Sequence, residues 1–375
     1  MIALQRTDEF VGRTMNWLYD HLRFLPRYTP VIFCDRLANR EEFPCLDART
    51  IDRQSLARRI WHRARGQRLY PLDRFRLARV GPRVLHSHFG YVAANDVKLA
   101  QALHVPWLVS FYGADVYQLG CQAQWQETYA AVFQGAAKVL ALGPAMAARL
   151  EKLGCPPEKV EVHFLGIDVE GLPFAPRKLG SDEPLRLLFA GTFREKKGIE
   201  YLVEAAARAR RSGVRLQLDL VGSAMGKPGD LETEQTVMRL IRDLGIRDIV
   251  KRHAFLPFKD LIELALRSHV FMAPSVTAAD GDSEGTPFVL QQMMATGMPA
   301  ITTAHSDIPF ILGDLSWTLV PERDPEAIAD RIRAFWDEPA SLVSEGEQCR
   351  RRMRQHFDIR QRATRLAEVY DTLQN

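Results

Sequence analysis

The stretch Pro274–Gln292, PSVTAADGDSEGTPFVLQQ, joins a predicted strand to a predicted helix through a polar loop. The apolar run His269–Ala273 before it is typical of a buried parallel strand, and Pro287 is well suited to the first turn of the next helix. The unpaired amides and positive dipole end of such a helix form a seat for a phosphate. Glu284 lies one turn earlier and, as an anion, favours a neutral hydroxyl such as that of a sugar. Together these features indicate a sugar phosphate or nucleotide sugar as ligand.

Short apolar runs alternate with helical patterns along the whole chain. The runs predicted as strands are Thr29–Phe33, Val84–His88, Trp107–Phe111, Val139–Leu142, Val160–Phe164, Leu187–Ala190, Leu216–Val221, His269–Ala273 and Ala300–Thr302. Strict alternation of strand and helix predicts doubly wound parallel sheets. We therefore expect an α/β protein with two Rossmann-like domains.

The pattern breaks once, at Gly171–Ser181, where Pro, Gly and basic residues follow one another without periodicity, as in a linker. The predicted domains are therefore residues 1–170 and 171–354. The last segment, Phe357–Asn375, carries apolar residues at helical spacing, so its helix requires an apolar surface to cover.

Length and composition set the outer limits. The 375 residues, 46% of them hydrophobic, are enough for two buried cores. No apolar stretch has the length of a membrane span, and the first residues, MIALQRTDEF, lack the pattern of a secretory signal. These features predict a cytoplasmic protein. The cysteines have no metal-like spacing and are expected to be reduced thiols: Cys34, Cys45, Cys121, Cys155 and Cys349.

The segment Arg53–Arg83 carries ten arginines and no lysine, with Trp61, Tyr70 and Phe75 among them. Two interpretations stay open. The segment lies against anionic lipid headgroups or a phosphate-bearing acceptor, which would make the protein peripheral on the inner face of the cytoplasmic membrane. Alternatively, it is a solvated helical face. No nucleic-acid-binding motif accompanies the charge, so nucleic acid is not an expected partner.

Residues 275–301, SVTAADGDSEGTPFVLQQMMATGMPAI, resemble the nucleotide-sugar signature of the retaining family 4 glycosyltransferases of the GT-B fold, in particular the branch that builds colanic-acid-type exopolysaccharides. In that family two glutamates, with seven residues between them, follow a Pro-Ser strand end. Glu284 occupies the first position and Gln292 the second. The resemblance implies an acceptor-binding domain at 1–170, a nucleotide-sugar-binding domain at 171–354, and a C-terminal helix, 355–375, packed back onto the first domain.

A second resemblance concerns the turn Ala190–Gly198, which is similar to the family turn whose Arg and Lys clamp the donor diphosphate. Lys197 matches the lysine, Thr192 replaces the arginine, and Arg194 is the candidate substitute. Alternatively, Lys196 and Lys197 are only exposed first-turn residues. The donor-binding residues that the resemblance implies are Gly191, Thr192, Arg194, Lys197, Gly222, Phe255, Leu256, Glu284, Gly285, Thr286, Pro287 and Gln292. Asp307 and Phe310 also depart from the family's pattern.

Two strand ends in the first half supply acceptor-side candidates, because ligands of parallel sheets bind at the carboxyl ends of strands. His88 ends one predicted strand, and Tyr112 and Asp115 follow the next. Family members commonly have a histidine where this chain has Tyr112. We expect His88 or Asp115 to contact the acceptor, with His88 a catalytic candidate beside Glu284 and Lys197. The alternative for His88 is a hydrogen-bonded core histidine.

The implied reaction moves a sugar from a nucleotide-sugar donor to a hydroxyl of a glycan or lipid-linked glycan, with retention at the anomeric carbon. No second carboxylate is a candidate nucleophile, so front-face departure of the diphosphate, stabilised by Lys197 and helix amides, fits better. The pattern Asp280, Asp282, Glu284 lacks a further ligand set, so neither a metal nor a cofactor is expected. Two alternatives remain: a non-catalytic relative that binds a nucleotide sugar or a partner enzyme, and a nucleotide-sugar epimerase.

Overall fold

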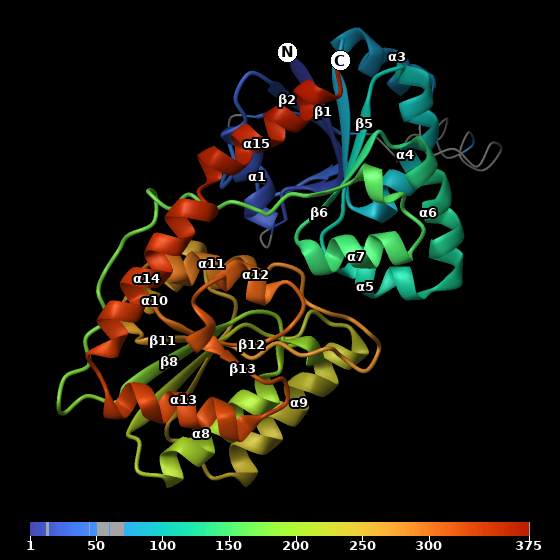
Figure 1. The fold of residues 1–375 in the computed structure, drawn as a ribbon. Coiled ribbons are helices and arrows are strands. Elements are labelled where there is room, and N and C mark those ends of the chain that lie inside the picture. Colours follow the sequence, from blue (N-terminus) through green and yellow to red (C-terminus); the bar gives the residue numbers. More distant parts are fainter. Residues whose placement is uncertain (13–14, 45, 51–59, 61–70, 375) are drawn as a thin grey trace. The chain divides into compact units, whose positions relative to one another are not determined.

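The computed structural model describes residues 1–12, 15–44, 46–50, 60 and 71–374, and it divides the chain into two compact units (Figure 1). The first contains Met1–Gly166 and Ile359–Asn375, and the second Ile167–Asp358. The chain passes from one unit to the other at residues 166–167 and 358–359, each four residues from the expected domain boundary. Local hydrogen bonds explain the first position. Gly166 donates its N–H to Nε2 of His21 in the first unit over 2.9 Å, whereas Ile167 forms a parallel bridge with Asp358 in the second.

The first unit is built on a parallel sheet of seven strands in the order β3-β2-β1-β4-β5-β6-β7. The strands are β1 (Ile2–Phe10), β2 (Thr29–Leu37), β3 (Asp47–Thr50), β4 (Val84–His88), β5 (Trp107–Ser110), β6 (Lys138–Ala141) and β7 (Val160–Val162). Because every pairing is parallel, all carboxyl ends of these strands lie at one edge of the sheet.

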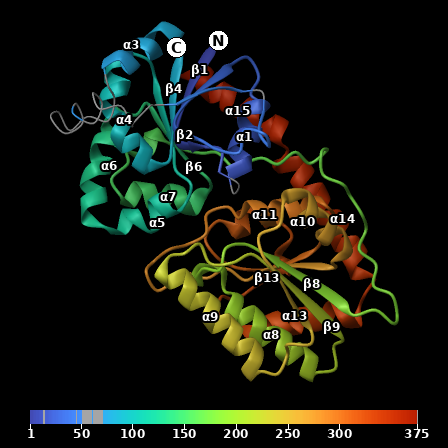
Figure 2. The ribbon, with the colours of Figure 1, turned by 180° about the vertical axis from the view of Figure 1, so that it is seen from behind.

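Helices cover both faces of this sheet, as the opposite views of Figures 1 and 2 show. They are α1 (Asn16–Arg23), α3 (Pro71–Val80), α4 (Gly90–Leu103), α5 (Ala114–Tyr117), α6 (Ala123–Gly135), α7 (Pro144–Lys152) and α15 (Ile359–Thr372). The C-terminal helix α15 belongs to this unit. It buries Leu366, Val369 and Tyr370 against a core that includes Ala3 and Val84.

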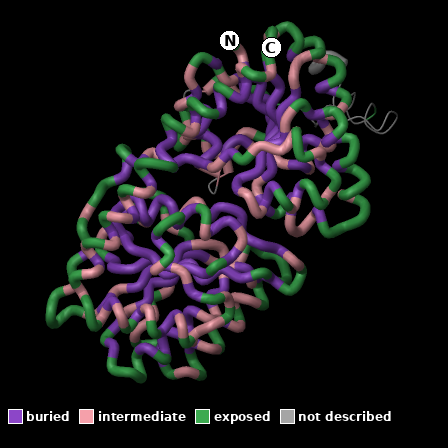
Figure 3. The backbone as a smooth tube through the Cα atoms, in the orientation of Figure 1, coloured by how far each residue is buried: buried purple, intermediate pink, exposed green. Residues whose placement is uncertain are grey.

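The second unit contains a parallel sheet of six strands in the order β10-β9-β8-β11-β12-β13. The strands are β8 (Leu185–Ala190), β9 (Leu216–Val221), β10 (Val250–His253), β11 (Val270–Ala273), β12 (Ala300–Thr303) and β13 (Leu319–Val320). Its helices are α8 (Ile199–Arg211), α9 (Pro228–Asp243), α10 (Phe258–Arg267), α11 (Phe288–Ala295), α12 (Ile308–Leu312), α13 (Pro325–Asp337) and α14 (Ser341–His356). In each unit the central strands form the buried interior (Figure 3). The prediction of two Rossmann-like parallel-sheet domains is confirmed.

Four strands were missed by the sequence pattern, namely β1, β3, β10 and β13. β10 and β3 are edge strands, and their polar sequences, VKRH and DART, lack an apolar run. β1 is central, yet it buries Arg6, whose guanidinium lies 2.8 Å from Asp35 and 3.2 Å from Asp96. A charged residue is found at the centre of a sheet only when it is paired, and the sequence of β1 does not show the pairing.

Other expectations meet smaller corrections or stay open. α11 begins at Phe288, so Pro287 immediately precedes the helix. Cys34, Cys121, Cys155 and Cys349 are free thiols, while Cys45 lies outside the described residues. More than half of the arginine-rich segment, residues 53–59 and 61–70, also lies outside them. Among the helices that the structure describes, none is long and apolar enough to span a membrane.

Candidate functional site

The loops that follow β8 and β9 touch one another at two glycines. Gly191 donates its N–H to the carbonyl of Val221 over 3.0 Å. Gly222 has φ +125°, and a Cβ on it would lie 1.9 Å from the carbonyl oxygen of Gly191. Only glycine fits here, because any side chain would both strain the backbone and collide with the neighbouring strand end. The carboxyl ends of β8 and β9 are therefore locked side by side.

A second close approach joins the turn after β8 to the end of β11. Gly198 has φ +61°, and a Cβ on it would lie 1.9 Å from the carbonyl oxygen of Pro274. Val276 donates its N–H to the carbonyl of Lys196 over 2.9 Å. The turn with the two lysines thus packs directly on the loop that leads to Glu284.

Glu284 is the centre of the charged cluster that results. Its side chain is 9% exposed, its Oε2 lies 3.0 Å from Nζ of Lys197, and its Oε1 lies 3.4 Å from Nζ of Lys196. Burial alone would raise the pKa of this carboxyl group, but the two ammonium groups outweigh burial and hold its pKa at about 2. Glu284 is therefore a carboxylate at any physiological pH, and both of its oxygens can accept a hydrogen bond from a hydroxyl.

The two lysines have different surroundings. Nζ of Lys196 lies 3.1 Å from Oδ1 of Asp282, 3.0 Å from the carbonyl oxygen of Ser283 and 3.4 Å from Oε1 of Glu284. Those three acceptors match the three donors of an ammonium group. Lys196 is buried, so the interpretation of both lysines as exposed residues is wrong for Lys196. Lys197 is half-buried, and within the described part of the chain its ammonium group pairs with Glu284 alone, which leaves donors for a ligand.

Arg194 is held by two carboxylates. Its guanidinium lies 3.0 Å from Asp282 and 3.5 Å from Asp230, and both carboxylates are buried. A diphosphate contact by Arg194 would therefore compete with these ion pairs. Thr192, at the position of the family arginine, adds no charge to the cluster.

The structure places the other donor-side candidates around the same strand ends. Gly285, Thr286 and Pro287 are buried between Glu284 and the start of α11. Gln292 lies on α11 and is 7% exposed. Phe255 and Leu256 follow β10, and Phe255 is exposed. All belong to the second unit, and their contacts with a donor stay a prediction.

Two residues near Glu284 were missed as site residues. His305 is buried after β12, and its Nε2 accepts the backbone N–H of Glu284 over 3.1 Å. Its Nδ1 lies 2.6 Å from Oε1 of Glu322, which follows β13. His305 lies two residues before Asp307 in the chain, and no local sequence pattern connects it to Glu284 or Glu322.

His88 lies in the first unit at the end of β4. Its Nδ1 bonds with the hydroxyl of Tyr112 over 2.6 Å, and its Nε2 with Oε1 of Gln5 over 2.9 Å. Burial lowers the pKa of His88 to about 3, with a smaller contribution from His21. An acceptor contact by His88 would have to replace one of these hydrogen bonds.

Asp115 is engaged by the backbone. Its carboxylate accepts N–H groups from Gly90, Tyr112 and Gly113 over 2.9–3.0 Å. Burial raises the pKa of Asp115, and these backbone hydrogen bonds oppose the increase. Asp115 thereby fixes the turn after β5 to the start of α4. Asp115 is buried, so it would influence an acceptor indirectly, by holding the backbone of Tyr112 in place.

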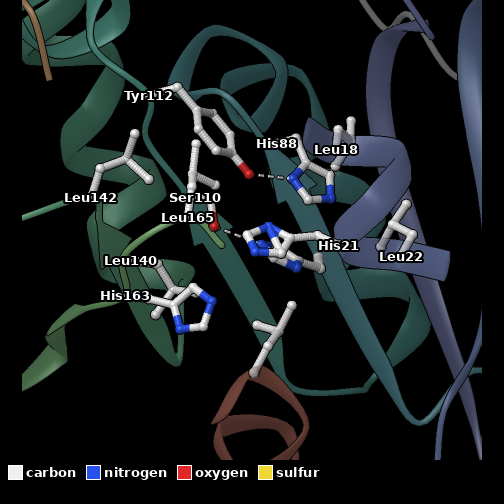
Figure 4. A pocket seen from close by; sticks show the side chains of 12 residues that line it. Leu18, His21, Leu22, His88, Ser110, Tyr112, Leu140, Leu142, His163 and Leu165 are labelled. Atoms are coloured by element: carbon white, nitrogen blue, oxygen red, sulfur yellow. Dashed lines mark hydrogen bonds between the residues drawn. The ribbon is translucent and has the colours of Figure 1, made fainter. Parts of the chain in front are cut away.

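A small cavity of about 20 Å³ lies beside His88 (Figure 4). Its walls include His21, His86, His88 and His163, together with leucine side chains. Neither ring nitrogen of His163 has a hydrogen-bond partner in the described part of the chain. A cavity of this volume holds one water molecule.

Metal chemistry has no candidate in the described part of the chain, since no group of three or more His, Cys, Asp or Glu side chains there could hold an ion. The expectation that neither a metal nor a cofactor is required stays a prediction.

Comparisons with known proteins identify the class. Residues 173–356 match the family described as glycosyl transferases group 1, and residues 11–166 match the glycosyl transferase 4-like domain. The chain therefore belongs to the glycosyltransferases, with one family domain in each half. The predicted family is confirmed.

Relatives with curated names agree with this class. WcaL of Escherichia coli, named for colanic acid biosynthesis, is 31% identical over 67% of this chain and 61% of its own length. The amylovoran biosynthesis glycosyltransferase AmsK of Erwinia amylovora is 29% identical over 76% of this chain and 69% of its own. The chain therefore spans less than two thirds of the length of the Escherichia coli WcaL.

Two solved structures show the fold. Sucrose-phosphate synthase of Thermosynechococcus elongatus has a TM-score of 0.80 at 18% identity, covering 100% of this chain and 99% of the other. HepE of Anabaena, crystallised with UDP, has a TM-score of 0.77 at 15% identity, covering 99% of each chain. The GT-B fold is confirmed by these similarities.

Proposed function

We propose that this glycosyltransferase moves a sugar from a nucleotide-sugar donor to an acceptor hydroxyl with retention at the anomeric carbon, in the synthesis of a cell-surface or extracellular polysaccharide. The observation that carries the proposal is the pairing of Glu284 with Lys197 at the strand ends of the second unit. One group accepts a hydroxyl, and the other attracts a phosphate. A nucleotide sugar offers both.

The chemistry assigned to these residues follows from their charges. Glu284 accepts a hydroxyl hydrogen of the donor sugar, because its carboxylate stays ionised. Lys197 donates to the diphosphate, whose negative charge grows as the bond to the sugar breaks. The backbone N–H groups of the first turn of α11 add further donors. In this scheme a diphosphate oxygen takes the proton of the acceptor hydroxyl, so no protein nucleophile is required.

The partners that we propose are a nucleotide-sugar donor and a glycan or lipid-linked glycan acceptor. WcaL and AmsK are named for the synthesis of colanic acid and amylovoran, which supports an acceptor in a growing extracellular polysaccharide. The arginines of Arg53–Arg83 suit the phosphate of a lipid-linked acceptor or an anionic membrane surface. We therefore also propose a cytoplasmic location with peripheral contact to the membrane.

A screen of nucleotide sugars tests the proposal. UDP-, GDP- and ADP-sugars are each added to the protein, and the melting temperature, release of free nucleoside diphosphate and sugar released by hydrolysis are measured. The expected result is one donor that raises the melting temperature and is hydrolysed slowly without acceptor. The sugar released first should have the same anomeric configuration as in the donor, because the reaction is proposed to proceed with retention. Binding without release would instead support the non-catalytic candidate, which the ion-paired state of Arg194 favours. No binding by any donor would overturn the proposal.

A further inference from the structure

His305 links the candidate donor site to a carboxylate on another strand end. The backbone N–H of Glu284 can only donate a hydrogen bond, so Nε2 of His305, 3.1 Å away, must be unprotonated. The carboxylate of Glu322, 2.6 Å from Nδ1, can only accept, so Nδ1 must carry the proton. The geometry therefore defines a neutral histidine in a single tautomer.

Glu322 also holds the beginning of the same loop. Its Oε2 accepts the N–H of Thr277 over 3.0 Å, while its Oε1 faces His305. Arg323 donates to the carbonyl of Thr277 as well. One carboxylate thus fixes the start of the loop directly and its end, at Glu284, through the imidazole.

The burial of this connection makes it stiff. The side chain of His305 is 1% exposed, and Glu284 is buried beside it. A buried N–H that loses its acceptor is costly, so the backbone at Glu284 has one strongly preferred position. That position sets where the Glu284 carboxylate lies relative to Lys197, and a hydrogen bond to a sugar hydroxyl depends on a few tenths of an ångström.

We propose that His305, held in the Nδ1–H tautomer by Glu322, is a positioning residue that sets the Glu284 carboxylate for the donor sugar. The inference rests on the proposed function, since it assigns Glu284 to the sugar. The proposal assigns the sugar and the diphosphate of the donor to different residues. The His305–Glu322 pair governs recognition of the sugar, whereas the diphosphate is bound by Lys197 and the backbone N–H groups of the first turn of α11.

Two variants distinguish the hydrogen bond at Nε2 of His305 from the one at Nδ1. His305→Gln keeps an acceptor near the position of Nε2, and His305→Asn keeps a polar group near Nδ1 but loses that acceptor. We expect amide hydrogen exchange at Glu284 to stay slow in His305→Gln and to become faster in His305→Asn. We expect the affinity for UDP-glucose or GDP-mannose, whichever binds, to fall on the order of tenfold in His305→Asn. The affinity for UDP or GDP alone should change less than about twofold.

His269 provides the matched control. It is a buried histidine of the same unit, it accepts the N–H of Arg186 over 2.9 Å, and it lies just before β11, at the amino end of that strand. Because the acceptor of His269 is Nδ1, the matched variant is His269→Gln, which loses that acceptor. His269→Gln is expected to change the melting temperature without changing the ratio of nucleotide-sugar affinity to nucleoside-diphosphate affinity. An equal change in that ratio in His269→Gln and His305→Asn would overturn the positioning role.

The tautomer is measured on the wild-type protein, so the test does not depend on a folded variant. Nitrogen NMR of histidine-labelled protein should show His305 protonated at Nδ1 and unprotonated at Nε2. Protonation at Nε2, or unchanged exchange at Glu284 in a folded His305→Asn, would overturn the inference. If wild-type protein binds no nucleotide sugar, the proposed function fails, while the tautomer and exchange results still decide whether His305 positions Glu284.

Discussion

The ammonium nitrogen of Lys197 lies 3.0 Å from Oε2 of Glu284, so the cation proposed for the diphosphate and the carboxylate proposed for the sugar are already ion-paired. The pairing has a physical benefit, because a buried carboxylate without a partner would take up a proton. It also fixes the distance between the two groups before a donor arrives. A site that is formed in advance loses less conformational freedom on binding.

The first prediction concerns the two lysines as a matched pair. Lys197→Met should lower turnover by roughly 100-fold, the scale of losing one donor to developing charge, with a smaller loss of donor affinity. Lys196→Met should mainly lower stability, by about 3 kcal/mol or more, because Asp282 and Glu284 lose a buried partner. Steady-state kinetics and urea unfolding measure the two effects. Turnover at the wild-type level in Lys197→Met would remove that lysine from the mechanism.

The second prediction concerns Glu284. Glu284→Gln should reduce kcat/KM by an amount equal to about 2–3 kcal/mol, the contribution of a hydrogen bond to a charged group. Glu326→Gln is the control, since Glu326 is 64% exposed and pairs with Arg208 at the surface. It should leave the kinetics unchanged. A similar loss in both variants would point to a general effect of charge rather than a sugar contact.

The third prediction concerns α11. Gln292 occupies the position of the family's ribose-binding glutamate, so Gln292→Glu should leave transfer intact or improve donor affinity. Its neighbour Gln291 is 0% exposed, and neither polar atom of its side chain has a partner in the described part of the chain. Gln291→Glu should destabilise the protein by burying an unpaired charge. Calorimetric titration measures the donor affinity of Gln292→Glu, and thermal unfolding measures the stability of Gln291→Glu. Loss of donor binding in Gln292→Glu would exclude the ribose contact.

The fourth prediction concerns the buried histidines of the first unit. Burial lowers the pKa of His21 from 6.5 to about 4, and burial together with neighbouring charges lowers the pKa of His88 and His163 to about 3. The unfolded chain takes up protons at each site below pH 6.5, whereas the folded unit resists protonation until pH 3–4. The stability from keeping these rings neutral is therefore present above pH 6.5 and is lost as the pH falls.

Between the pKa of the unfolded chain and that of the folded unit, each of these histidines should lower the free energy of unfolding by about 1.4 kcal/mol for every pH unit of acidification. Urea unfolding at several pH values, followed by amide exchange in the first unit, measures the effect. His163→Phe should reduce the slope by the share of one histidine. Constant stability of the first unit between pH 7 and pH 5 would contradict the burial of neutral imidazoles.

The fifth prediction concerns the arginine-rich segment. If Arg53–Arg83 contacts anionic headgroups, binding to vesicles with phosphatidylglycerol should weaken as salt is added, because screening shortens the range of the attraction. Replacing Arg58, Arg59, Arg63 and Arg65 with serine should weaken it further. Arg208→Ser and Arg210→Ser, on a surface of the second unit, provide the control. Absent or salt-independent binding would leave the solvated-face interpretation.

The local sequence determined the architecture and the two principal charged groups of the site. Apolar runs between helical patterns predicted parallel strands, because a strand covered on both faces is apolar throughout. The strand end at Pro274 and the loop with Glu284 followed from the same local signals, and the turn with Lys197 was found by its resemblance to the family's turn. Each depends on residues that are neighbours in the chain, so its pattern is present before folding.

Only the tertiary structure decided how these groups are held. Arg6 is buried in the central strand β1 because it pairs with Asp35 and Asp96, which lie on other elements. Lys196 is buried because Asp282, Ser283 and Glu284 surround its ammonium group. His305 and Glu322 became part of the site only when β11, β12 and β13 were paired side by side. Hydrogen bonds between residues that are distant in the sequence depend on strand order and register, which no local periodicity specifies.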